Sequence, residues 1–453
     1  MIKTQKVYRC FFLLCFLWSN VYGIFAQDAN RVRAQHIYEW FAAGQGDSIY
    51  IALNKELQGK LSPVMFNGTF RETEKVFGKL QSKSEWQTEN VQGGTLYYSD
   101  LKFERYDFRF ILAFDADGAM NTIRLSPVPA TSVTPSVAYN EKKMSERDIT
   151  VGAEGFQLPG TLTVPKFATV AEARKVPCII LVHGSGPHDR DETIGPNKPF
   201  RDIAWGLAER GIAVIRYDKR TKTYGADCVP AGRVLDYDTE VVDDVLSAVA
   251  LAKTLPEIAS DSIYVLGHSL GGTLAPRIAE RSKELAGIIV LAGLARPFED
   301  AVEEQTVYIM SLAPASAEAK MQFADLKEQL NNVRKLGTNA FDEQIPLPLN
   351  LPRSYWEFAN AYKPVSVAAK LKLPIFVLQG ERDYQVTMED FAFWRFGLWR
   401  NKNAFFKSYP KLNHLLQEGT GKATPMEYSR ASSVPAYVLN DLAAFAHGIR
   451  NMF

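Results

Sequence analysis

The stretch VLGHSLGG, residues 265–272, holds a serine in a pattern that can do chemistry. Its central residues, Gly267 to Gly271, fit G-x-S-x-G, in which a strand turns so sharply into a helix that only glycine fits on either side of the serine. A hydroxyl presented at such a turn can attack a carbonyl carbon once a base removes its proton. The same pattern also arises by chance, so Ser269 could instead be a small residue in a glycine-rich turn.

A base for Ser269 has to come from one of six histidines. His414 is the first choice, because it follows the apolar stretch AFFKSY and should emerge at the same edge of a sheet as Ser269. His188, in a loop that could reach the same cleft, is the second choice. Two of the others are expected to lie too far away, His36 in a separate N-terminal domain and His447 on the last helix. His183 is expected to have a structural role at a strand end, and His268 is expected to point away from the serine.

A carboxylate must hold the imidazole in the tautomer that accepts the serine proton. The stretch IFVLQGERDYQV supplies two, and Asp383 is favoured because the G-x-x-D-x-x-V spacing places it just beyond Gly380. Glu381 is the alternative. The prediction is a catalytic triad of Ser269, Asp383 and His414.

Negative charge that develops on a substrate oxygen needs hydrogen-bond donors. The segment from His183 to Pro187, HGSGP, follows the apolar run CIILV, and its glycines let backbone amides approach a substrate closely. We assign the oxyanion hole to the backbone N–H groups of Ser185 and Leu270. A neighbour of Ser185 could supply the amide in its place.

These groups can act together only if the fold brings them to one edge of a sheet. Short apolar or β-branched runs predict strands, and the stretches between them have helical patterns. Such alternation favours a mostly parallel sheet with its ligand site at the carboxyl ends of the strands. The predicted strands are 178–182, 213–217, 263–266, 288–291, 375–378 and 404–409, and the predicted helices are 200–210, 239–255 and 270–283. Two antiparallel strands in ITVGAEGFQLPGTLTVP should precede them.

From about residue 146 to the end, the chain resembles an α/β-hydrolase of the bacterial carboxylesterase kind, in the motifs LVHGSGPHDRDE, VIRYDKR and VLGHSLGG and in the chain order Ser, Asp, His. The resemblance implies an eight-stranded α/β-hydrolase fold, ester hydrolysis and the triad named above. It departs after Arg220, where TKTYG replaces a glycine-serine turn, so the shape of that rim should differ.

Two charged runs lie near the expected cleft. The run from His188 to Glu192, HDRDE, is interpreted as a solvated loop with internal ion pairs rather than a metal or substrate site. In RYDKR, the charges of Arg216, Asp218, Lys219 and Arg220 are expected to brace loops near the cleft.

A long insertion before the strand that carries Asp383 predicts a cap, at about residues 296–370. It has helical patterns at 298–312 and 316–335 and an aromatic group in Tyr355, Trp356 and Phe358. These aromatics either line the cleft or pack the cap on the sheet. Caps select substrates, so specificity should reside here.

The N-terminal part has a different organisation. Residues 1–26 resemble an export signal, with basic residues before a short apolar run and small Ala26 before Gln27. Residues 27–125 predict a small α+β domain, and 126–135 a linker before the hydrolase domain at 136–453. This domain resembles the one of unknown function, related to the nuclear-transport-factor fold, that precedes some bacterial hydrolases. Its aromatics, including Trp40, Phe41 and Phe108, are expected to form core rather than a binding box.

Composition excludes several other classes of protein. Of 453 residues, 46% are apolar, and 52 basic side chains balance 51 acidic ones, so strong attraction to nucleic acid is not indicated. The histidines are scattered and the mature chain has only two cysteines, so the sequence suggests no set of metal ligands. The two cysteines, Cys178 and Cys228, are expected to be buried thiols rather than a disulfide.

The leading hypothesis is an exported, periplasmic or secreted serine hydrolase that cleaves small-molecule carboxylic esters through an acyl-enzyme. It needs no cofactor, no metal and no membrane span after signal cleavage. The first alternative is a serine aminopeptidase or oligopeptidase, in which cap carboxylates such as Glu303 and Glu304 would bind a substrate amine. The second is a non-catalytic binding protein on a hydrolase scaffold.

Overall fold

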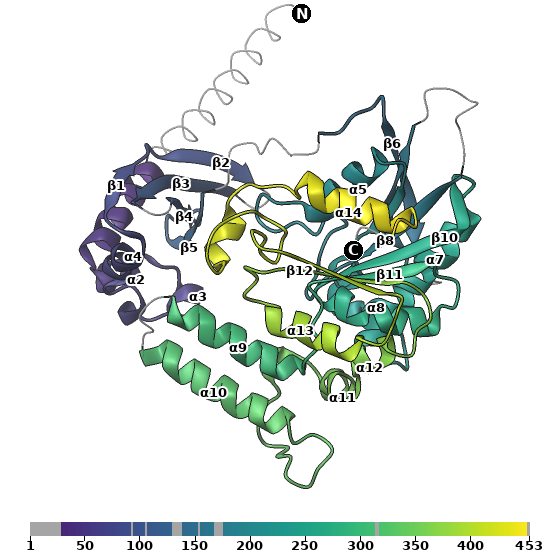
Figure 1. Cartoon of the computed structure of the whole chain (residues 1–453). Helices are drawn as coiled ribbons and strands as arrows, with labels where there is room; N and C mark the ends of the chain where they lie inside the picture. Colours follow the sequence, from purple (N-terminus) through teal and green to yellow (C-terminus); the bar gives the residue numbers. More distant parts are fainter. Residues whose placement is uncertain are drawn as a thin grey trace, which may run out of the picture. The chain divides into compact units, whose positions relative to one another are not determined.

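The computed structural model describes residues 29–91, 94–104, 107–128, 138–152, 155–166, 175–312 and 317–450. The chain divides into two compact units, Met1–Pro129 and Ala130–Phe453 (Figure 1). The predicted export signal and most of the predicted linker lie outside the described residues. Among the described residues, no helix has the length and apolar character needed to cross a membrane.

The N-terminal unit contains helices followed by an antiparallel sheet. Phe41, Phe108 and Phe110 are buried, and the Phe41 and Phe110 rings stack with their centres 5.0 Å apart, which confirms that these phenylalanines form core. Trp40 is half-buried at the edge of this core. A first helix at residues 29–43 precedes α2 (Gly46–Ala52), α3 (Lys55–Gln58) and α4 (Thr69–Phe77). The strands pair in the order β1-β3-β4-β5, with β2 also on β3: β1 (Leu80–Lys83), β2 (Gln87–Val91), β3 (Gly94–Phe103), β4 (Asp107–Phe114) and β5 (Met120–Pro127).

The second unit is built on an eight-stranded sheet of order β13-β12-β11-β10-β8-β9-β7-β6. The pairs β6–β7 and β7–β9 are antiparallel and the others are parallel, which confirms the mostly parallel α/β-hydrolase sheet. The strands are β6 (Met144–Val151), β7 (Leu158–Pro165), β8 (Val176–Val182), β9 (Ala213–Tyr217), β10 (Ile258–His268), β11 (Gly287–Leu291), β12 (Ile375–Gly380) and β13 (Ala404–Tyr409).

Helices cover both faces of this sheet (Figure 1). Along β8, Ile179 and Leu181 pack in the cluster that contains α5 (Pro199–Ala208) and α14 (Ala436–Ala446). The alternate residue Ile180 packs in the cluster that contains α7 (Asp243–Thr254) and α8 (Leu270–Arg281). Successive residues of a strand point to opposite faces of the sheet, so a strand that is buried on both faces is apolar throughout. These continuous apolar runs are the reason why the sequence predicted the sheet.

The insertion between β11 and β12 forms the predicted helical cap. Its helices are α9 (Phe298–Ser311), α10 (Ala317–Val333), α11 (Arg353–Ala361) and α12 (Pro364–Ala368). Trp356 is fully buried, and its ring stacks on Phe298 with centres 5.1 Å apart. Trp356 therefore packs the cap instead of lining the cleft.

The segment TKTYG after Arg220, where the sequence differs from the carboxylesterase pattern, lies after β9. Most of it belongs to a helical turn, α6 (Arg220–Tyr224). Tyr224 Oη there accepts a hydrogen bond from Gln157 N at 2.8 Å, tying the turn to the start of β7.

Candidate active site

Ser269 lies between β10 and α8, in a backbone conformation with φ of 54° that side chains other than glycine rarely adopt. The neighbouring glycines are needed because the chain packs on itself. A β-carbon at Gly267 would lie 2.0 Å from Gly271 O, and one at Gly271 would lie 2.3 Å from Val182 O. The G-x-S-x-G pattern therefore forms the sharp strand-to-helix turn that the sequence predicted.

The structure brings Asp383 and His414 together beyond neighbouring strands. Asp383 follows β12, His414 follows β13, and His414 Nδ1 lies 2.6 Å from Asp383 Oδ2. Asp383 Oδ1 also accepts hydrogen bonds from the backbone N–H groups of Gln385 and Val386, at 2.7 and 3.1 Å. Both partners of the pair are buried. The carboxylate is thus fixed, and it accepts a hydrogen bond from the Nδ1–H group, which leaves Nε2 as the acceptor nitrogen of His414.

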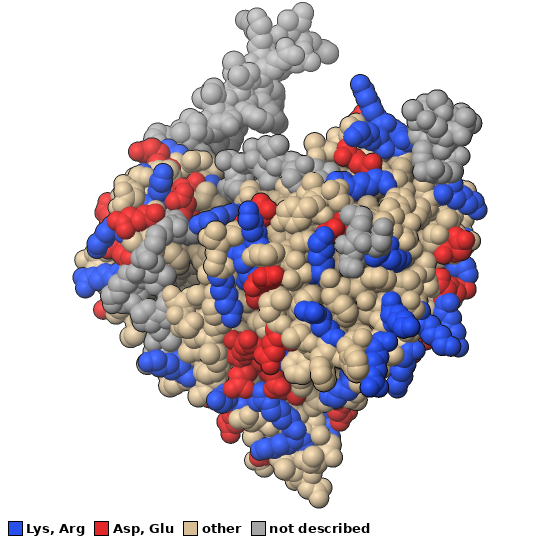
Figure 2. All heavy atoms as spheres, viewed as in Figure 1, with Lys and Arg blue, Asp and Glu red and all other residues tan. Residues whose placement is uncertain are grey.

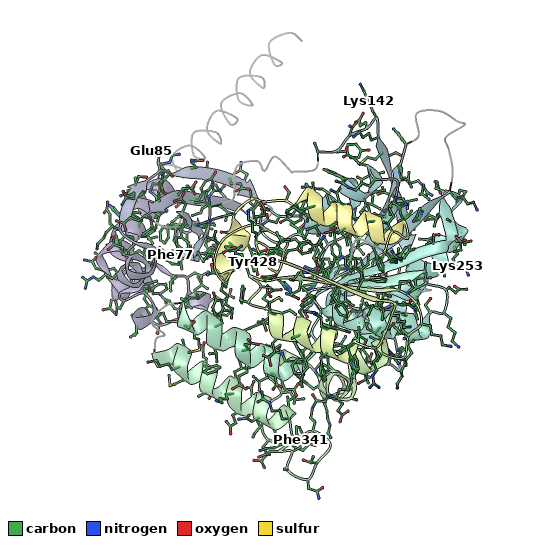
Figure 3. All side chains as sticks on the ribbon, in the orientation of Figure 1. Phe77, Glu85, Lys142, Lys253, Phe341 and Tyr428 are labelled. Carbon is green, nitrogen blue, oxygen red and sulfur yellow. The ribbon has the colours of Figure 1, made fainter. Side chains whose placement is uncertain are left out.

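A buried loop holds His414 in place. The Oδ1 atom of fully buried Asn413 accepts hydrogen bonds from Leu415 N and Gln417 N, at 3.1 and 3.0 Å. On the Asp383 side, Gln385 Nε2 donates to the hydroxyl of Tyr428 at 3.0 Å, and Tyr428 is labelled in Figure 3 on the short helix η6 (Pro425–Ser429). The loops that carry the acid and the base are therefore both held by hydrogen bonds.

Ser269 and His414 line the same cavity. Among the described residues, no hydrogen bond joins the Ser269 hydroxyl to the His414 imidazole. Such bonds between nucleophile and base are often loose before substrate binds and tighten in the reacting complex. The fallback acid Glu381 is turned elsewhere, because it accepts a hydrogen bond from Ser408 Oγ at 2.7 Å.

The two residues whose amides are assigned to the oxyanion hole line this cavity as well. Leu270 is the first residue of α8, so its N–H has no partner within the helix. Both Ser185 and Leu270 line the cavity, and Gly184 approaches so closely that a β-carbon there would lie 3.1 Å from Ser269 Cβ. The Gly184 N–H is not available, because it donates to Glu192 Oε1 at 2.7 Å. That excludes one of the two neighbours that could have replaced Ser185.

Glu192 and His268 form a buried pair that the sequence analysis missed. Glu192 is 1% exposed, and its Oε2 lies 2.8 Å from His268 Nδ1. His268 Nε2 in turn lies 2.9 Å from the carbonyl oxygen of His414. The pair therefore connects the Gly184 loop, the serine turn and the His414 loop behind the cavity.

The interpretation of residues 188–192 as a solvated loop with internal ion pairs is wrong. Arg190 pairs with Asp218 at 3.0 Å, and Asp191 pairs with Lys198 at 2.9 Å, so the run bonds to other segments. A turn with φ of 51° at Glu192 then directs that side chain inward. A charged run usually indicates a surface, and only the distant partner His268 would have revealed the exception.

Each member of the buried pair determines the ionisation of the other. Burial opposes ionisation of Glu192, but the charge of His268 and its hydrogen bond lower the pKa of this carboxyl to about 2. Burial would also lower the pKa of His268, yet Glu192 raises it above its ordinary value. Both ring nitrogens of His268 face acceptor oxygens, those of Glu192 and of the His414 carbonyl, so the geometry fits a carboxylate paired with an imidazolium.

Lys219 contacts the same loop from the opposite side. The residue is 2% exposed, and its ammonium donates to Gly184 O at 2.8 Å and to Glu240 Oε1 at 2.6 Å. Glu240 lies in the π-helical turn η4 (Asp238–Val242) and also accepts a hydrogen bond from Tyr355 Oη of the cap helix α11 at 2.7 Å. The expectation that RYDKR braces loops near the cleft is confirmed for Lys219, and also for Asp218, which pairs with Arg190.

Two other histidines near the cavity have backbone partners. His188 Nε2 donates to Ser185 O at 2.6 Å, and burial lowers the pKa of its imidazole. His183 Nε2 donates to Asp189 O at 3.0 Å, and burial lowers its pKa to about 4. Both therefore position the loop that carries Ser185, and His183 has the structural role expected of it.

The cavity has a volume of about 410 Å³ and combines one polar wall with an apolar one. The described residues include no cluster of three or more side chains of a kind that could hold a metal ion. The apolar wall comes mainly from the cap and the strand-end loop before it, through Leu294, Phe298, Val302, Ile309, Leu349 and Ala359. Such a wall suits an uncharged, apolar portion of a substrate.

Charged cap residues near the cavity are already paired. Arg296 lines the cavity, and its guanidinium contacts Glu304 at 2.6 Å and fully buried Asp390 at 3.0 Å. Glu303 instead pairs with Arg334 at 2.8 Å. Among the described residues that line the cavity, the one carboxylate is Glu192, which the His268 imidazolium and the Gly184 N–H engage.

Comparison with known proteins identifies both parts of the chain. Residues 174–418 match the family described as serine aminopeptidase, S33, and residues 34–122 match a family described as protein of unknown function DUF3887. The esterase EstD of Thermotoga maritima is 33% identical over 434 residues, which cover 95% of this chain and 98% of that protein.

Solved structures with a similar arrangement include Est1E of Butyrivibrio proteoclasticus and an esterase of Pyrococcus furiosus. The first is 18% identical with a TM-score of 0.42, over 66% of this chain and 99% of that one. The second is 17% identical with a TM-score of 0.39, over 58% and 81%. The family match and the full-length relative lead to one conclusion: the chain belongs to the serine aminopeptidase S33 family of α/β-hydrolases, and it is a hydrolase of the carboxylesterase type.

Proposed function

We propose that this enzyme cleaves carboxylic esters through an acyl-enzyme formed on Ser269. The single observation that supports this most is the 2.6 Å contact of buried Asp383 with His414, in a cavity that Ser269 also lines. His414 Nε2 removes the Ser269 proton as Oγ attacks the ester carbonyl carbon. The carbonyl oxygen becomes an oxyanion, which the N–H groups of Ser185 and Leu270 stabilise.

The reaction then proceeds in two stages, and the first tetrahedral intermediate collapses in the first of them. The alkoxy group leaves with the proton that His414 returns to it, and the acyl group remains on Ser269 Oγ. Water next attacks the acyl carbon while His414 takes one of its protons, which forms a second tetrahedral intermediate. The bond between the acyl carbon and Ser269 Oγ then breaks, His414 returns the proton to Oγ, and the carboxylic acid leaves. Asp383 stabilises the imidazolium in both stages.

The charges of the cavity favour esters over the amine-bearing substrates of an aminopeptidase. An α-ammonium group needs a free carboxylate, whereas Glu303 and Glu304 are paired with arginines and Glu192 with His268. The remaining cap wall is apolar. The proposed substrates are therefore small uncharged esters with an apolar acyl or alcohol group.

The test is covalent labelling by a serine-reactive phosphonate, combined with hydrolysis of short acyl esters and of aminoacyl amides. We expect Ser269→Ala to abolish labelling and to lower kcat by roughly four to six orders of magnitude. Ser262→Ala, a half-exposed serine away from the cavity, is the control and should behave as wild type. Undiminished ester hydrolysis by purified Ser269→Ala would contradict the mechanism, and faster cleavage of aminoacyl amides than of esters would favour the aminopeptidase.

We also propose that the enzyme is exported, on the basis of the basic and apolar order of residues 1–26. Expression in a bacterial host should release a mature chain that begins at Gln27. N-terminal sequencing of the periplasmic or secreted protein measures this, and an intact Met1 in the cytoplasmic fraction would contradict it.

A further inference from the structure

Charged side chains contact both backbone polar groups of Gly184, and its carbonyl belongs to the peptide group that joins Gly184 to Ser185. Its carbonyl oxygen accepts a hydrogen bond from the Lys219 ammonium at 2.8 Å. The preceding N–H, that of Gly184, donates to Glu192 at 2.7 Å. Lys219 and Glu192 are 2% and 1% exposed, so water screens neither contact strongly. We call these two side chains the Gly184 clamp.

We propose that Lys219 is a positioning residue that strengthens the oxyanion hole through this peptide group, an inference that rests on the proposed ester hydrolysis. The Gly184 carbonyl and the Ser185 N–H belong to one amide. A cation on the carbonyl oxygen draws electron density from the nitrogen and makes the N–H a stronger donor. The same contact fixes the plane of the amide before substrate arrives, as electrostatic stabilisation of a transition state requires.

The cap supplies the other end of this connection. Tyr355 Oη of α11 donates a hydrogen bond to Glu240 Oε2, and Glu240 Oε1 accepts one from Lys219 Nζ. The Nε2 atom of His188 donates a hydrogen bond to the carbonyl oxygen of Ser185. A series of hydrogen bonds therefore joins the cap, the π-helical turn and the oxyanion loop. It ends at the amide that contains the Ser185 N–H, the proposed oxyanion donor.

The experiment compares an ester with the thionoester in which sulfur replaces the carbonyl oxygen. Sulfur is a weak hydrogen-bond acceptor, so the thionoester depends little on the oxyanion donors. The variant is Lys219→Met with Glu240→Gln, which removes the ammonium without leaving a buried carboxylate unpaired. Glu240→Gln alone, which keeps the Lys219 contact to Gly184, is the matched control.

For the double variant we expect kcat on the ester to fall by about 10- to 100-fold with KM within about threefold, because one oxyanion donor is weakened rather than removed. kcat on the thionoester should fall by less than about threefold. Equal losses on the two substrates, or none on the ester, would overturn the proposal and leave Lys219 as a loop brace. Full activity of Ser269→Ala would instead reject the ester mechanism itself.

A separate observation concerns the surface formed by α13 (Met388–Gly397), the turn that follows it and the segment after α12. Phe393, Phe396 and Trp399 are 47%, 79% and 67% exposed. Exposed basic side chains accompany them: Arg395, Arg400, Lys402, Lys370 and Lys372. The two segments adjoin, because Asn403 Nδ2 donates to Lys372 O at 2.7 Å. We call these eight residues the aromatic–basic surface.

Charge is strongly segregated here, although the whole chain is balanced. Residues 358–380 and 391–417 together contain eight lysines and arginines, three and five respectively, and no aspartate or glutamate. The two carboxylates in the first turn of α13, Glu389 and Asp390, pair with Arg296. Figure 2 shows Lys and Arg side chains, separated by uncharged surface, over the region of α12 and α13. Aromatic rings beside basic side chains are typical of protein surfaces that rest at the boundary between lipid headgroups and acyl chains.

We propose that the aromatic–basic surface binds the face of an anionic lipid bilayer. The rings enter the headgroup boundary while the cations attract anionic headgroups, and two such signals together give stable peripheral binding. Each Lys or Arg near an anionic surface raises the partition coefficient about fivefold.

The test is co-sedimentation of the full chain with vesicles of phosphatidylcholine alone or mixed with phosphatidylglycerol. We expect at least about tenfold tighter binding to the mixed vesicles, lost in 0.5 M salt. Phe396→Ser with Trp399→Ser, and separately Arg395→Gln with Arg400→Gln and Lys402→Gln, should each weaken binding about tenfold or more. The matched controls should bind as wild type: Ile51→Ser with Val64→Ser, which are 76% and 74% exposed, and the exposed lysines Lys283→Gln, Lys320→Gln and Lys335→Gln.

Absence of vesicle binding, equal binding to both lipid mixtures, or equal loss in a control variant would overturn the proposal. A dimer that dissociates on Phe396→Ser with Trp399→Ser, without any lipid binding, would also overturn it and assign the surface to a second copy of the chain.

Discussion

At the scale of single residues, the cavity depends on charges that lie behind the reacting groups. Glu192 and His268 touch the Gly184 loop and the carbonyl of His414. Neither contacts the Ser269 hydroxyl, yet both hold segments that carry reacting or stabilising groups. An ion pair this buried is costly to break, because removing one charge leaves the other without a partner.

The pH dependence of stability should reveal this pair. The lowered pKa of Glu192 stabilises the folded state above the ordinary carboxyl value of about 4.3, and this is lost as pH falls toward 2. The raised pKa of His268 stabilises it below about 6.5, and this is lost as pH rises through the folded-state value. The difference in free energy of unfolding between wild type and Glu192→Gln should therefore be greatest between about pH 4.3 and 6.5.

Urea denaturation across that range measures the difference. A constant difference from pH 4 to 9 would show that the pair is not ionised as described. The variant Glu389→Gln, at a carboxylate 57% exposed, should show a small and nearly flat difference.

The sequence could predict the positions of Ser269, Asp383 and His414 because each follows a strongly apolar strand, and strand ends determine which edge of a sheet a residue occupies. It could not identify Glu192, since the pairing with His268 spans 76 residues and depends on a single turn. The catalytic roles of the three residues remain predictions that the labelling experiment tests.

At the scale of elements, the serine turn depends on backbone atoms that approach closely. Gly271→Ala would bring a β-carbon to 2.3 Å from Val182 O and 2.8 Å from His183 O, and backbone atoms cannot rotate away. We expect a loss of about 3 kcal/mol in stability and loss of ester hydrolysis, since β8 and the turn would have to separate. Gly59→Ala, where the nearest atom would lie at 3.4 Å, is the control and should change stability by less than about 1 kcal/mol.

Thermal unfolding and ester hydrolysis measure both variants. Wild-type stability in Gly271→Ala would mean that the turn is looser than described.

Strands and cap helices were predictable at this scale because period and apolar content are local properties. The predicted cap helices 298–312 and 316–335 correspond to α9 and α10, and all six predicted strands lie within β8 to β13. The π-helical turn η4 was not predictable, because its extra residue leaves no mark on the apolar period. It places Glu240 against Lys219, and π-turns are often found at functional sites.

At the scale of the whole molecule, the two units have separate sheets and separate cores. All residues of the proposed mechanism lie in the second unit, between Gly184 and His414. A chain that begins at residue 130 should therefore fold and keep kcat/KM for small esters within about tenfold of the full chain.

Purification of that shorter chain and assay with a short acyl ester test this expectation, with its Ser269→Ala form as the blank. A soluble, folded product with more than about 100-fold less activity would show that the N-terminal unit contributes to the site.

Cys178 and Cys228, the cysteines of the described residues, are free and buried. Burial raises the pKa of the Cys178 thiol, so it stays protonated and resists oxidants. The described part of the chain, residues 29–450 with its gaps, consequently holds no sulfur cross-link, and reductants or disulfide-forming catalysts should leave its folding unchanged. A reducing cytosol can thus produce the same folded enzyme as an oxidising envelope.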